Sequence, residues 1–315
     1  MSVTYDRNAL PKCTVPAAEV TRVKGLGFLR DKTTEDCFNA RVITRNGKIT
    51  ADEMYAIADA ARRYGKGEVA FTTRQTVEVQ GISFENIQPF CRELAKHGLM
   101  VGGTGPRVRP IVSCKGTTCV FGLCDTYGLS RKIHERFYVG YHAVKLPHKF
   151  KIAVGGCPNN CVKPDINDVG VIGAWVPQLV ADECAGCGAC EKVCPVGALK
   201  MVDGKPTFAD TCLACGRCVR ACKKGAIEYD GGFRITLGGR WGKLTARGQK
   251  LSPLFRTEDE VMDTIEKIIL FFRDKGVAGE RFADTVARVG FENAEAAILS
   301  DELIRRKDEI LEKAL

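Results

Sequence analysis

The sequence contains no long apolar segment. No stretch approaches the roughly 18 uninterrupted apolar residues of a membrane-spanning helix, and residues 1–12 lack an apolar core of signal-peptide length. A G-x-G-x-x-G fingerprint after a predicted strand is also missing, which argues against a Rossmann-type flavin or nicotinamide site. No region has the composition of a disordered segment. We therefore expect a cytoplasmic globular protein that does not enter a membrane.

Cysteine, by contrast, is abundant. The 315 residues include 16 cysteines, and disulfides are a poor explanation for them because cytoplasmic thiols are kept reduced. Clustered cysteines in such a chain indicate metal or iron–sulfur ligation. The net charge of +9 fits an anionic substrate or cofactor, an acidic protein partner or nucleic acid. Nucleic acid is the weakest of these, because the basic residues are scattered and lack interleaved aromatic stacking positions.

Hydrophobic patterning predicts an α/β (α+β) protein. Residues 38–82 read as a βαβ-type unit, in which Thr50 and Glu53 form a capping box for a helix that ends near Tyr64. Alternating residues predict strands at 68–73 and 76–80, and a second helix is predicted at 83–97. Later elements are expected as strands at 109–113, 151–154, 168–172 and 233–237, and as helices at 130–137 and 258–274.

Residues 181–230 differ from both flanks, because their composition shifts to cysteine, glycine and alanine. The spacing C-x2-C-x2-C-x3-C-P occurs at Cys184, Cys187, Cys190 and Cys194. The same spacing, with Lys223 in place of the proline, recurs at Cys212, Cys215, Cys218 and Cys222. This segment is therefore predicted to be a separate module inserted into the α/β chain.

Such paired runs are typical of two-cluster ferredoxins, in which the fourth cysteine of each run ligates the other cluster. One [4Fe-4S] cluster is thus predicted to bind Cys184, Cys187, Cys190 and Cys222. The other is predicted to bind Cys212, Cys215, Cys218 and Cys194. Paired zinc knuckles fit poorly, because zinc needs only four ligands and no third C-x2-C step.

A second group of cysteines lies outside that module. Cys114 and Cys119 form one pair and Cys157 and Cys161 another, and four thiolates in two pairs suit a third [4Fe-4S] cluster. Cys124 follows Cys119 at the interval that separates Cys119 from Cys114, so it is the reserve candidate for the second ligand. The commonest fate of a free cysteine is a small buried hydrophobe, which we expect for Cys13, Cys37, Cys91 and Cys124.

In these segments the sequence resembles the siroheme-containing nitrite and sulfite reductases. Within that family it is most similar to the C subunits of anaerobic sulfite reductases, which also carry an inserted dicluster ferredoxin. The resemblance covers roughly residues 38–292, and its most specific segments are 72–76, 146–151, 154–161, 168–173 and 279–284. It implies a ferredoxin-like half-domain (1–105), a siroheme and [4Fe-4S] domain (106–178 plus 231–315) and an inserted two-[4Fe-4S] ferredoxin domain (179–230).

The resemblance also implies the cofactors, which are a siroheme and three [4Fe-4S] clusters. By position, Cys161 bridges the third cluster to the siroheme iron, although the family spacing C-x5-C is shortened to C-x4-C at Cys114 and Cys119. Arg74 and the loop containing Gly239 and Arg240 are candidates to bind the eight siroheme carboxylates.

Four cations match family positions that hold and protonate the substrate oxyanion, and these are the predicted catalytic residues: Arg41, Arg109, Lys149 and Lys151. Alternate residues of a strand point to the same face, so Lys149 and Lys151 can reach one pocket while Phe150 packs behind them.

The function that the resemblance implies is six-electron reduction of sulfite to sulfide. Electrons would enter the ferredoxin clusters from a separate donor protein or from iron–sulfur and flavin subunits. Reduction of nitrite to ammonia is the first alternative, and a three-cluster electron-transfer protein without a catalytic haem is the second. A relay has no need of the four cations, which favours catalysis. The chain has one copy of a unit that the family uses twice, so a homodimer or a heterodimer with a related chain is expected.

Overall fold

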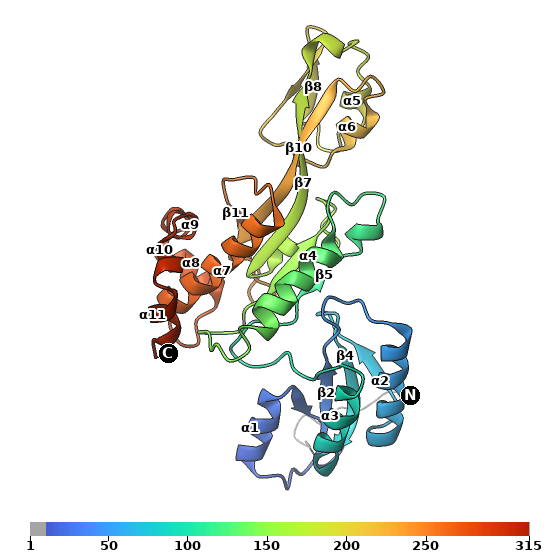
Figure 1. Ribbon diagram of the computed structural model, residues 1–315, viewed down its shortest axis with the longest axis vertical. Coiled ribbons are helices and arrows are strands. Elements are labelled where there is room, and N and C mark those ends of the chain that lie inside the picture. Colours follow the sequence, from blue (N-terminus) through green and yellow to red (C-terminus); the bar gives the residue numbers. More distant parts are fainter. Residues whose placement is uncertain (1–10, 315) are drawn as a thin grey trace.

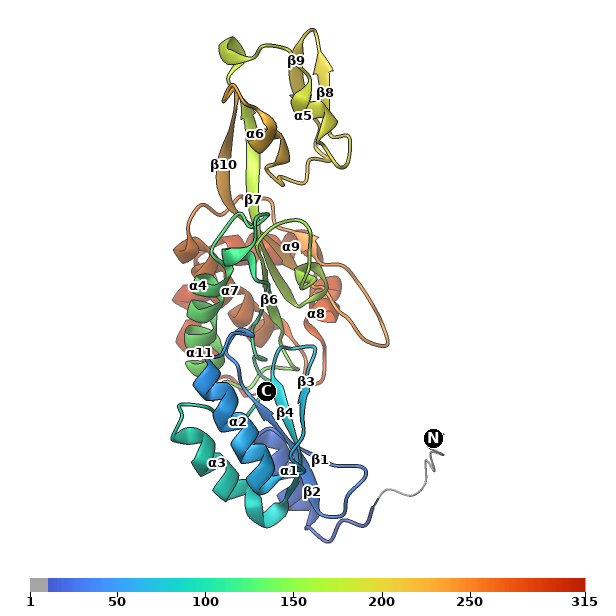
Figure 2. The same cartoon turned by 90° about the vertical axis from the view of Figure 1, so that its right-hand side faces the viewer.

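The computed structural model describes residues 11–314, and its first unit is an antiparallel sheet covered by helices. The strand order is β1-β2-β4-β3, with β1 (Phe28–Arg30), β2 (Cys37–Val42), β3 (Val69–Phe71) and β4 (Val77–Ser83). Its helices are α1 (Ala17–Gly25), α2 (Ala51–Tyr64) and α3 (Ile87–Ala95), with a 3-10 turn at Phe84–Asn86. Helices α2 and α3 lie side by side against the sheet (Figure 2), and their apolar residues share one core with it.

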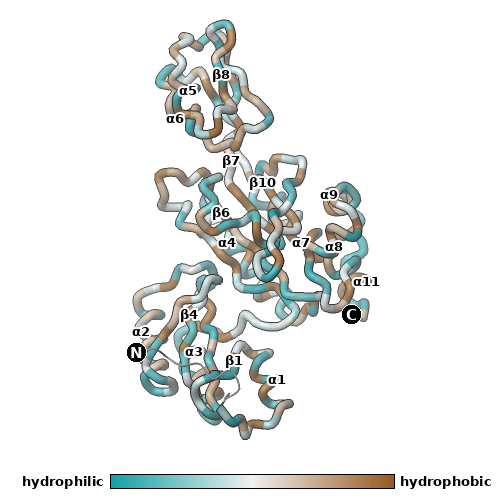
Figure 3. Tube along the Cα trace, turned by 180° about the vertical axis from the view of Figure 1, so that it is seen from behind, coloured by the Kyte–Doolittle hydropathy of each residue, from teal (hydrophilic) through white to brown (hydrophobic). Residues whose placement is uncertain are grey.

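The second unit is built on a mixed sheet of order β11-β10-β7-β6-β5. Strands β5 (Val112–Ser113), β6 (Ile152–Gly155) and β7 (Val169–Leu179) are parallel, whereas β10 (Ile227–Leu237) and β11 (Gln249–Lys250) are antiparallel. Hydrophobic segments, brown in Figure 3, run through these strands. Short 3-10 turns occur at Gly116–Thr118 and Pro164–Ile166.

Helices enclose this second core. They are α4 (Thr126–Ile133), which continues into a π-helical turn (His134–Val139), and α7 (Glu258–Lys275), α8 (Phe282–Val289), α9 (Phe291–Leu299), α10 (Glu302–Arg305) and α11 (Lys307–Glu312). Among residues 11–314, no helix combines the length and apolarity needed to cross a membrane.

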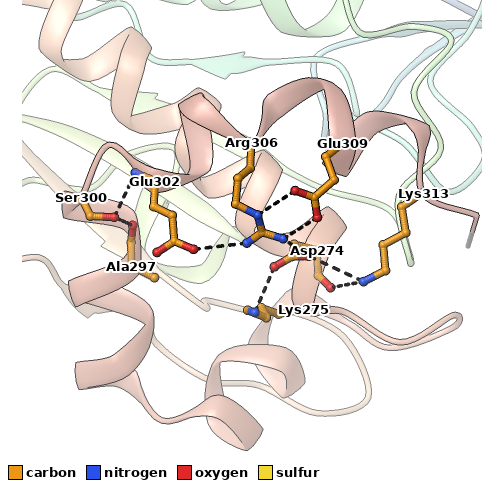
Figure 4. Close-up of polar contacts among 8 residues, drawn as sticks. All are labelled: Asp274, Lys275, Ala297, Ser300, Glu302, Arg306, Glu309 and Lys313. Carbon is orange, nitrogen blue, oxygen red and sulfur yellow. Dashed lines mark hydrogen bonds and ion pairs between the residues drawn. The ribbon is translucent and has the colours of Figure 1, made fainter.

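The C-terminal helices are fastened to α7 by a charge network centred on Asp274 (Figure 4). The Asp274 carboxylate is 6% exposed and lies 3.0 Å from Lys275 and 3.6 Å from both Arg306 and Lys313. Arg306 also pairs with Glu309 and Glu302. Because its central carboxylate is largely buried, this network restrains α11 more effectively than isolated surface pairs would.

An arm of residues 180–226 projects from the second unit (Figure 1, top). Strands β7 and β10 pair over 11 residues, from Val169 with Leu237 to Leu179 with Ile227, and carry the arm at their far ends. The arm contains a 3-10 turn (Ala181–Glu183), α5 (Ala189–Lys192), the hairpin β8 (Leu199–Val202) and β9 (Lys205–Phe208), and α6 (Arg217–Ala221). Gly188 and Gly216, both at φ 69°, precede α5 and α6, so the repeated cysteine spacing folds as a repeated turn and helix.

Several expected elements are confirmed, and others differ in extent. The capping box is present, since Thr50 Oγ1 accepts from Glu53 N and the Glu53 carboxylate accepts from Thr50 N. Residues 38–82 form a split βαβ unit, because β2 and β3 both pair antiparallel with β4 and so run parallel to each other, with β4 between them. The strand expected at 109–113 is only Val112–Ser113, and the helix expected at 130–137 begins at Thr126, where the Asp125 carboxylate caps Gly128 N.

Phe282 supplies the central ring of an aromatic cluster in the second core. It is fully buried, and its ring centre lies 5.3 Å from those of both Phe150 and Phe272. Phe282→Ala should lower the free energy of unfolding by about 3–5 kcal/mol, through lost burial and the cavity left behind. Urea denaturation followed by near-ultraviolet circular dichroism would measure the loss. The matched control Val277→Ala changes a 60% exposed side chain and should stay within about 0.5 kcal/mol of wild type; similar losses in both variants would contradict the packing argument.

Candidate functional site

Four cysteines from two loops surround one cavity of ≈ 540 Å³, which we call the thiol cavity. They are Cys114 and Cys119, which follow β5, and Cys157 and Cys161, which follow β6. Because β5 and β6 are parallel neighbours, the loops after them leave the same edge of the sheet. Gly116 and Gly156 let these loops touch, since a Cβ on either would lie within 3.0 Å of the other's Cα.

The arm contains two more cysteine-lined cavities. The first arm cavity, of ≈ 360 Å³, is lined by Cys184, Cys187, Cys190 and Cys222. The second arm cavity, of ≈ 20 Å³, is lined by Cys194, Cys212, Cys215 and Cys218. Each cavity therefore takes three thiols from one run and the fourth from the other, as the spacing predicts. The second is narrow, so its thiols must move apart to enclose a cube of iron and sulfide.

A basic cavity of ≈ 400 Å³ adjoins the thiol cavity. Its lining includes Arg74, Lys151, Lys163 and Trp241. Cys161 and Gln75 line both cavities, so an exposed thiol stands at the boundary between them. Gln75 reaches this position from the turn between β3 and β4, where its side chain donates to Ser113 O and accepts from Ser113 N.

Lys151 is the predicted catalytic cation that lines the basic cavity. Burial, together with the positive charge of Arg74, lowers the pKa of Lys151 to about 8. Its backbone N–H donates to the fully buried carboxylate of Asp168 at 2.9 Å, which fixes the segment that enters β6. Phe150 is buried against Phe272 and Phe282, as expected for the residue between the two lysines. Lys149 does not line the cavity that Lys151 lines, so a pocket shared by both lysines stays a prediction.

The other three predicted catalytic cations do not line the basic cavity, but each is close enough to the next to repel its charge, from Lys151 through Lys149 and Arg109 to Arg41. Burial, then Arg281 and Arg109, lowers the pKa of Lys149. Burial and then Arg41 lower the pKa of Arg109 to about 10. Arg109 N donates to Phe150 O at 2.7 Å, which holds this arginine beside the lysine segment. Arg41 lies opposite Glu78 on β4, and its Nε is 3.4 Å from that carboxylate.

The predicted siroheme-binding residues are partly committed to contacts within the protein. Arg74 is half-buried and donates to Pro110 O, Ile152 O and Asn167 Oδ1, and desolvation lowers its pKa to about 10. Arg240 pairs with Asp284 at 2.6 Å. Gly239 packs so tightly against the backbone of residues 165–167 that a Cβ would collide with it. Their assignment to the siroheme carboxylates stays a prediction.

Sequence reasoning missed Arg281 and Asp168 as site residues. Arg281 Nη2 lies 3.3 Å from Asp168 Oδ1, and the positive charge of Arg281 lowers the pKa values of Lys149 and Lys151. The sequence could have indicated both residues, because they fall inside segments that carry the family resemblance, 168–173 and 279–284. Their contact spans 113 residues of chain, which patterning does not detect.

The donors present fit the groups that the sequence predicts. Each cysteine cavity offers four thiols, the ligand set of a [4Fe-4S] cluster. Buried guanidinium Nε atoms without hydrogen-bond partners belong to Arg109, Arg240 and Arg281, although none of these arginines lines the basic cavity itself. Buried donors that lack acceptors are costly, so an anionic ligand would relieve them. Among residues 11–314, no three His, Cys, Asp or Glu side chains are grouped for a single metal ion.

Cys119 and Cys124 have different surroundings. Cys119 lines the thiol cavity, whereas Cys124 packs against the second core, with its Sγ where a Cβ on Gly173 would lie. Burial raises the pKa of Cys124 to about 12, but it also raises the pKa of the predicted ligands Cys157 and Cys218, so the packing of Cys124 is what separates it from Cys119. The geometry therefore favours Cys119 as the second ligand.

Two family comparisons cover most of the chain. Residues 104–306 match the nitrite and sulphite reductase 4Fe-4S domain, and residues 30–97 match the nitrite/sulfite reductase ferredoxin-like half domain. Among solved structures, dissimilatory sulfite reductase I superposes with a TM-score of 0.67 at 23% identity, covering 83% of this chain and 69% of that one. The Mycobacterium tuberculosis NirA protein superposes with a TM-score of 0.64 at 16% identity, covering 96% and 48%. These likenesses establish the fold.

Three proteins related by sequence each match more than two thirds of this chain. An uncharacterized protein of Methanocaldococcus jannaschii is 34% identical, over 82% of this chain and 90% of its own length. The C subunit of the anaerobic sulfite reductase of Salmonella typhimurium is 35% identical, over 72% of each chain. The coenzyme F420-dependent sulfite reductase of M. jannaschii is 35% identical over 76% of this chain, which spans only 38% of that enzyme.

Iron content distinguishes the two candidate ligands. Cys119→Ser should lose the cluster of the thiol cavity, and hence about 4 irons per chain, because the cube then lacks one thiolate. Cys124→Ser should keep the wild-type iron content, since the Cys124 side chain lies in the core rather than the cavity. The measurement is iron per chain after anaerobic purification. Loss of iron in Cys124→Ser with retention in Cys119→Ser would reverse the assignment.

Proposed function

The chain belongs to the nitrite and sulphite reductase 4Fe-4S family, and on that premise we propose that it reduces sulfite to sulfide as the catalytic chain of an anaerobic sulfite reductase. The observation that carries the proposal is the boundary position of Cys161, which lines both a four-thiol cavity and a strongly basic one. An electron-transfer protein needs the first cavity but has no use for the second.

Siroheme would occupy the basic cavity and a [4Fe-4S] cluster the thiol cavity, with Cys161 joining the two metal centres. Bound siroheme supplies an iron at which a sulfur oxyanion can be reduced. Arg74, Arg240 and Arg281 would face the siroheme carboxylates, and the buried Nε atoms of the last two are donors without partners. Charge-assisted bonds to carboxylates are about twice as strong as neutral ones, which offsets the cost of gathering these cations.

The residues of the chain then hold the substrate and deliver protons. Sulfite is a small dianion, and Arg41, Arg109, Lys149 and Lys151 together would neutralise it through charge-assisted hydrogen bonds. Removing its oxygens as water consumes protons. Lys151 suits a proton donor, because a pKa of about 8 lets its ammonium release a proton near neutral pH. Asp168 accepts from Lys151 N and pairs with Arg281, and it would thereby hold the lysine segment and Arg281 in fixed positions.

The arm would carry two [4Fe-4S] clusters, one in each arm cavity, and pass electrons from a separate donor protein toward the thiol cavity. The chain has one copy of a unit that, by the family resemblance, is used twice around the siroheme, so we propose that a second copy, or a related chain, completes the enzyme. Nitrite reduction to ammonia is the alternative activity, because it needs the same six electrons and the same cationic pocket. The sulfite reductases among the relatives described above favour sulfite.

The spectrum and iron content of the anaerobically purified protein test the cofactor assignment. We expect isobacteriochlorin bands that shift when sulfite is added, and about 13 irons per chain from three cubes and one haem. Parallel assays with sulfite and nitrite identify the preferred substrate. Three clusters without siroheme, after expression in a host that makes siroheme, would instead support the electron-transfer function.

The dependence of sulfite affinity on pH tests the role of Lys151. An ammonium attracts the anion only while it is protonated, so affinity should be retained below pH 8 and weaken as pH rises through about 8, the pKa of Lys151. Lys151→Met should raise KM about tenfold or more at pH 7 and remove the additional rise above pH 8. The control Lys145→Met changes an exposed lysine and should follow the wild-type profile. An unchanged profile in Lys151→Met would assign the pH dependence to another group.

A further inference from the structure

One arginine of the arm reaches back to the loop that carries Cys119. Arg220, in α6, donates from Nη1 to Val120 O at 2.5 Å and from Nη2 to Gly122 O at 3.1 Å. The two partners are about 100 residues away in sequence. A planar guanidinium holds two carbonyls in a fixed geometry, which a flexible ammonium does not.

The same guanidinium is stacked on an aromatic pair at the base of the arm. It lies 5.1 Å from the ring centre of Trp175, and the indole also stacks on Tyr229, with ring centres 4.0 Å apart and planes at 17°. Trp175 belongs to β7 and Tyr229 to β10, so both strands that carry the arm meet here. Gly216 fits against the indole, where a Cβ would lie 2.7 Å from Cε3. The stack therefore fixes how α6 sits above the strands.

Further contacts place the Cys212–Arg220 segment, rather than the Cys184–Cys190 segment, against the body. Trp175 N donates to Ala214 O at 2.8 Å, and Arg234 Nη1 donates to Cys212 O at 3.3 Å. The Arg217 guanidinium lies 6.0 Å from the ring centre of Phe121. Across the arm, Cys187 of the first arm cavity is exposed. The second arm cavity is thus the one turned toward the Cys119 loop.

The contact made by Arg220 ties together the chain segments that line the two facing cavities. Cys218, which lines the second arm cavity, precedes Arg220 by two residues, and Val120 directly follows Cys119, which lines the thiol cavity. The hydrogen bond from Arg220 to Val120 O therefore sets how the Cys218 segment lies relative to the Cys119 loop. Electron transfer between two clusters depends on their separation, which this contact would keep fixed.

We propose that Arg220 is a positioning residue that docks the arm on the Cys119 loop and thereby couples the cluster of the second arm cavity to that of the thiol cavity. This inference rests on the proposed function. In each step one electron leaves the reduced arm cluster and enters the oxidised cluster of the thiol cavity, with no bond made or broken. The electrons come from a low-potential one-electron donor, and the first arm cavity, with its exposed Cys187, is where they enter.

Pre-reduced holoprotein mixed with sulfite tests the coupling without an external donor. A fast change of the siroheme bands should come first, followed by oxidation of the arm clusters, which freeze-quench paramagnetic resonance resolves. Arg220→Ala should slow only the second phase, about tenfold or more. Arg220→Lys keeps the positive charge but cannot make both hydrogen bonds of the guanidinium, so it should recover part of the rate of the second phase. Lys200→Ala removes an arm cation whose described partner, Glu191, is also in the arm, and should match wild type.

Hydrogen–deuterium exchange gives a readout independent of turnover. In Arg220→Ala, exchange should rise in residues 117–123 and 212–221 but not in β8 and β9. Equal second phases and equal exchange in Arg220→Ala and wild type would overturn the inference. A wild-type protein in which sulfite produces no fast siroheme phase would instead count against the proposed function, and the exchange data would still decide whether Arg220 docks the arm.

Discussion

The pairing of β7 with β10 is the constraint on which the rest of the structure depends. Eleven residue pairs make it the longest ladder among the described strands, and both cofactor regions are attached to it. At one end, the residues just before β7 include Asp168, which holds Lys151 and Arg281. At the other end, the same two strands leave the body and support the arm. A shift of register would therefore move the basic cavity and the arm together, because alternate residues would exchange faces.

Electrostatics sets the second constraint. Arg74, Lys149, Lys151 and Arg281 lie around one buried carboxylate, that of Asp168, and Arg109 lies near Arg74 and Arg281. Burial and mutual repulsion lower the pKa values of Arg74, Arg109, Lys149 and Lys151. A protein tolerates such an excess of buried positive charge when a ligand supplies the missing negative charge. A polycarboxylate macrocycle and a dianionic substrate would do so. The arrangement thus favours function at some expense to the stability of the empty fold.

The sequence was most informative where the chemistry is local. The capping box at Thr50 and the crossed cysteine sets of the arm follow from spacings of a few residues, and the structure reproduces both arrangements. Spacing could not choose between Cys119 and Cys124, because both intervals are equal and only the packing of Cys124 against the core separates them. Nothing in the sequence singles out Arg220, because its partners lie about 100 residues away. The position of β4 between β2 and β3 likewise depends on long-range pairing.

Both central cavities lie at the seam between the two units, so a ligand bound there would have a structural role as well as a chemical one. Gln75 of the first unit bonds to Ser113 of the second, and Asn46 Nδ2 donates to Ser130 Oγ at 3.1 Å. Together with the bonds that Arg74 makes to the second unit, these polar contacts hold the units together beside Cys161. A ligand that contacts both units binds only their docked arrangement, so its binding free energy adds to the stability of that arrangement. The geometry around Cys161 is therefore set by the two units jointly.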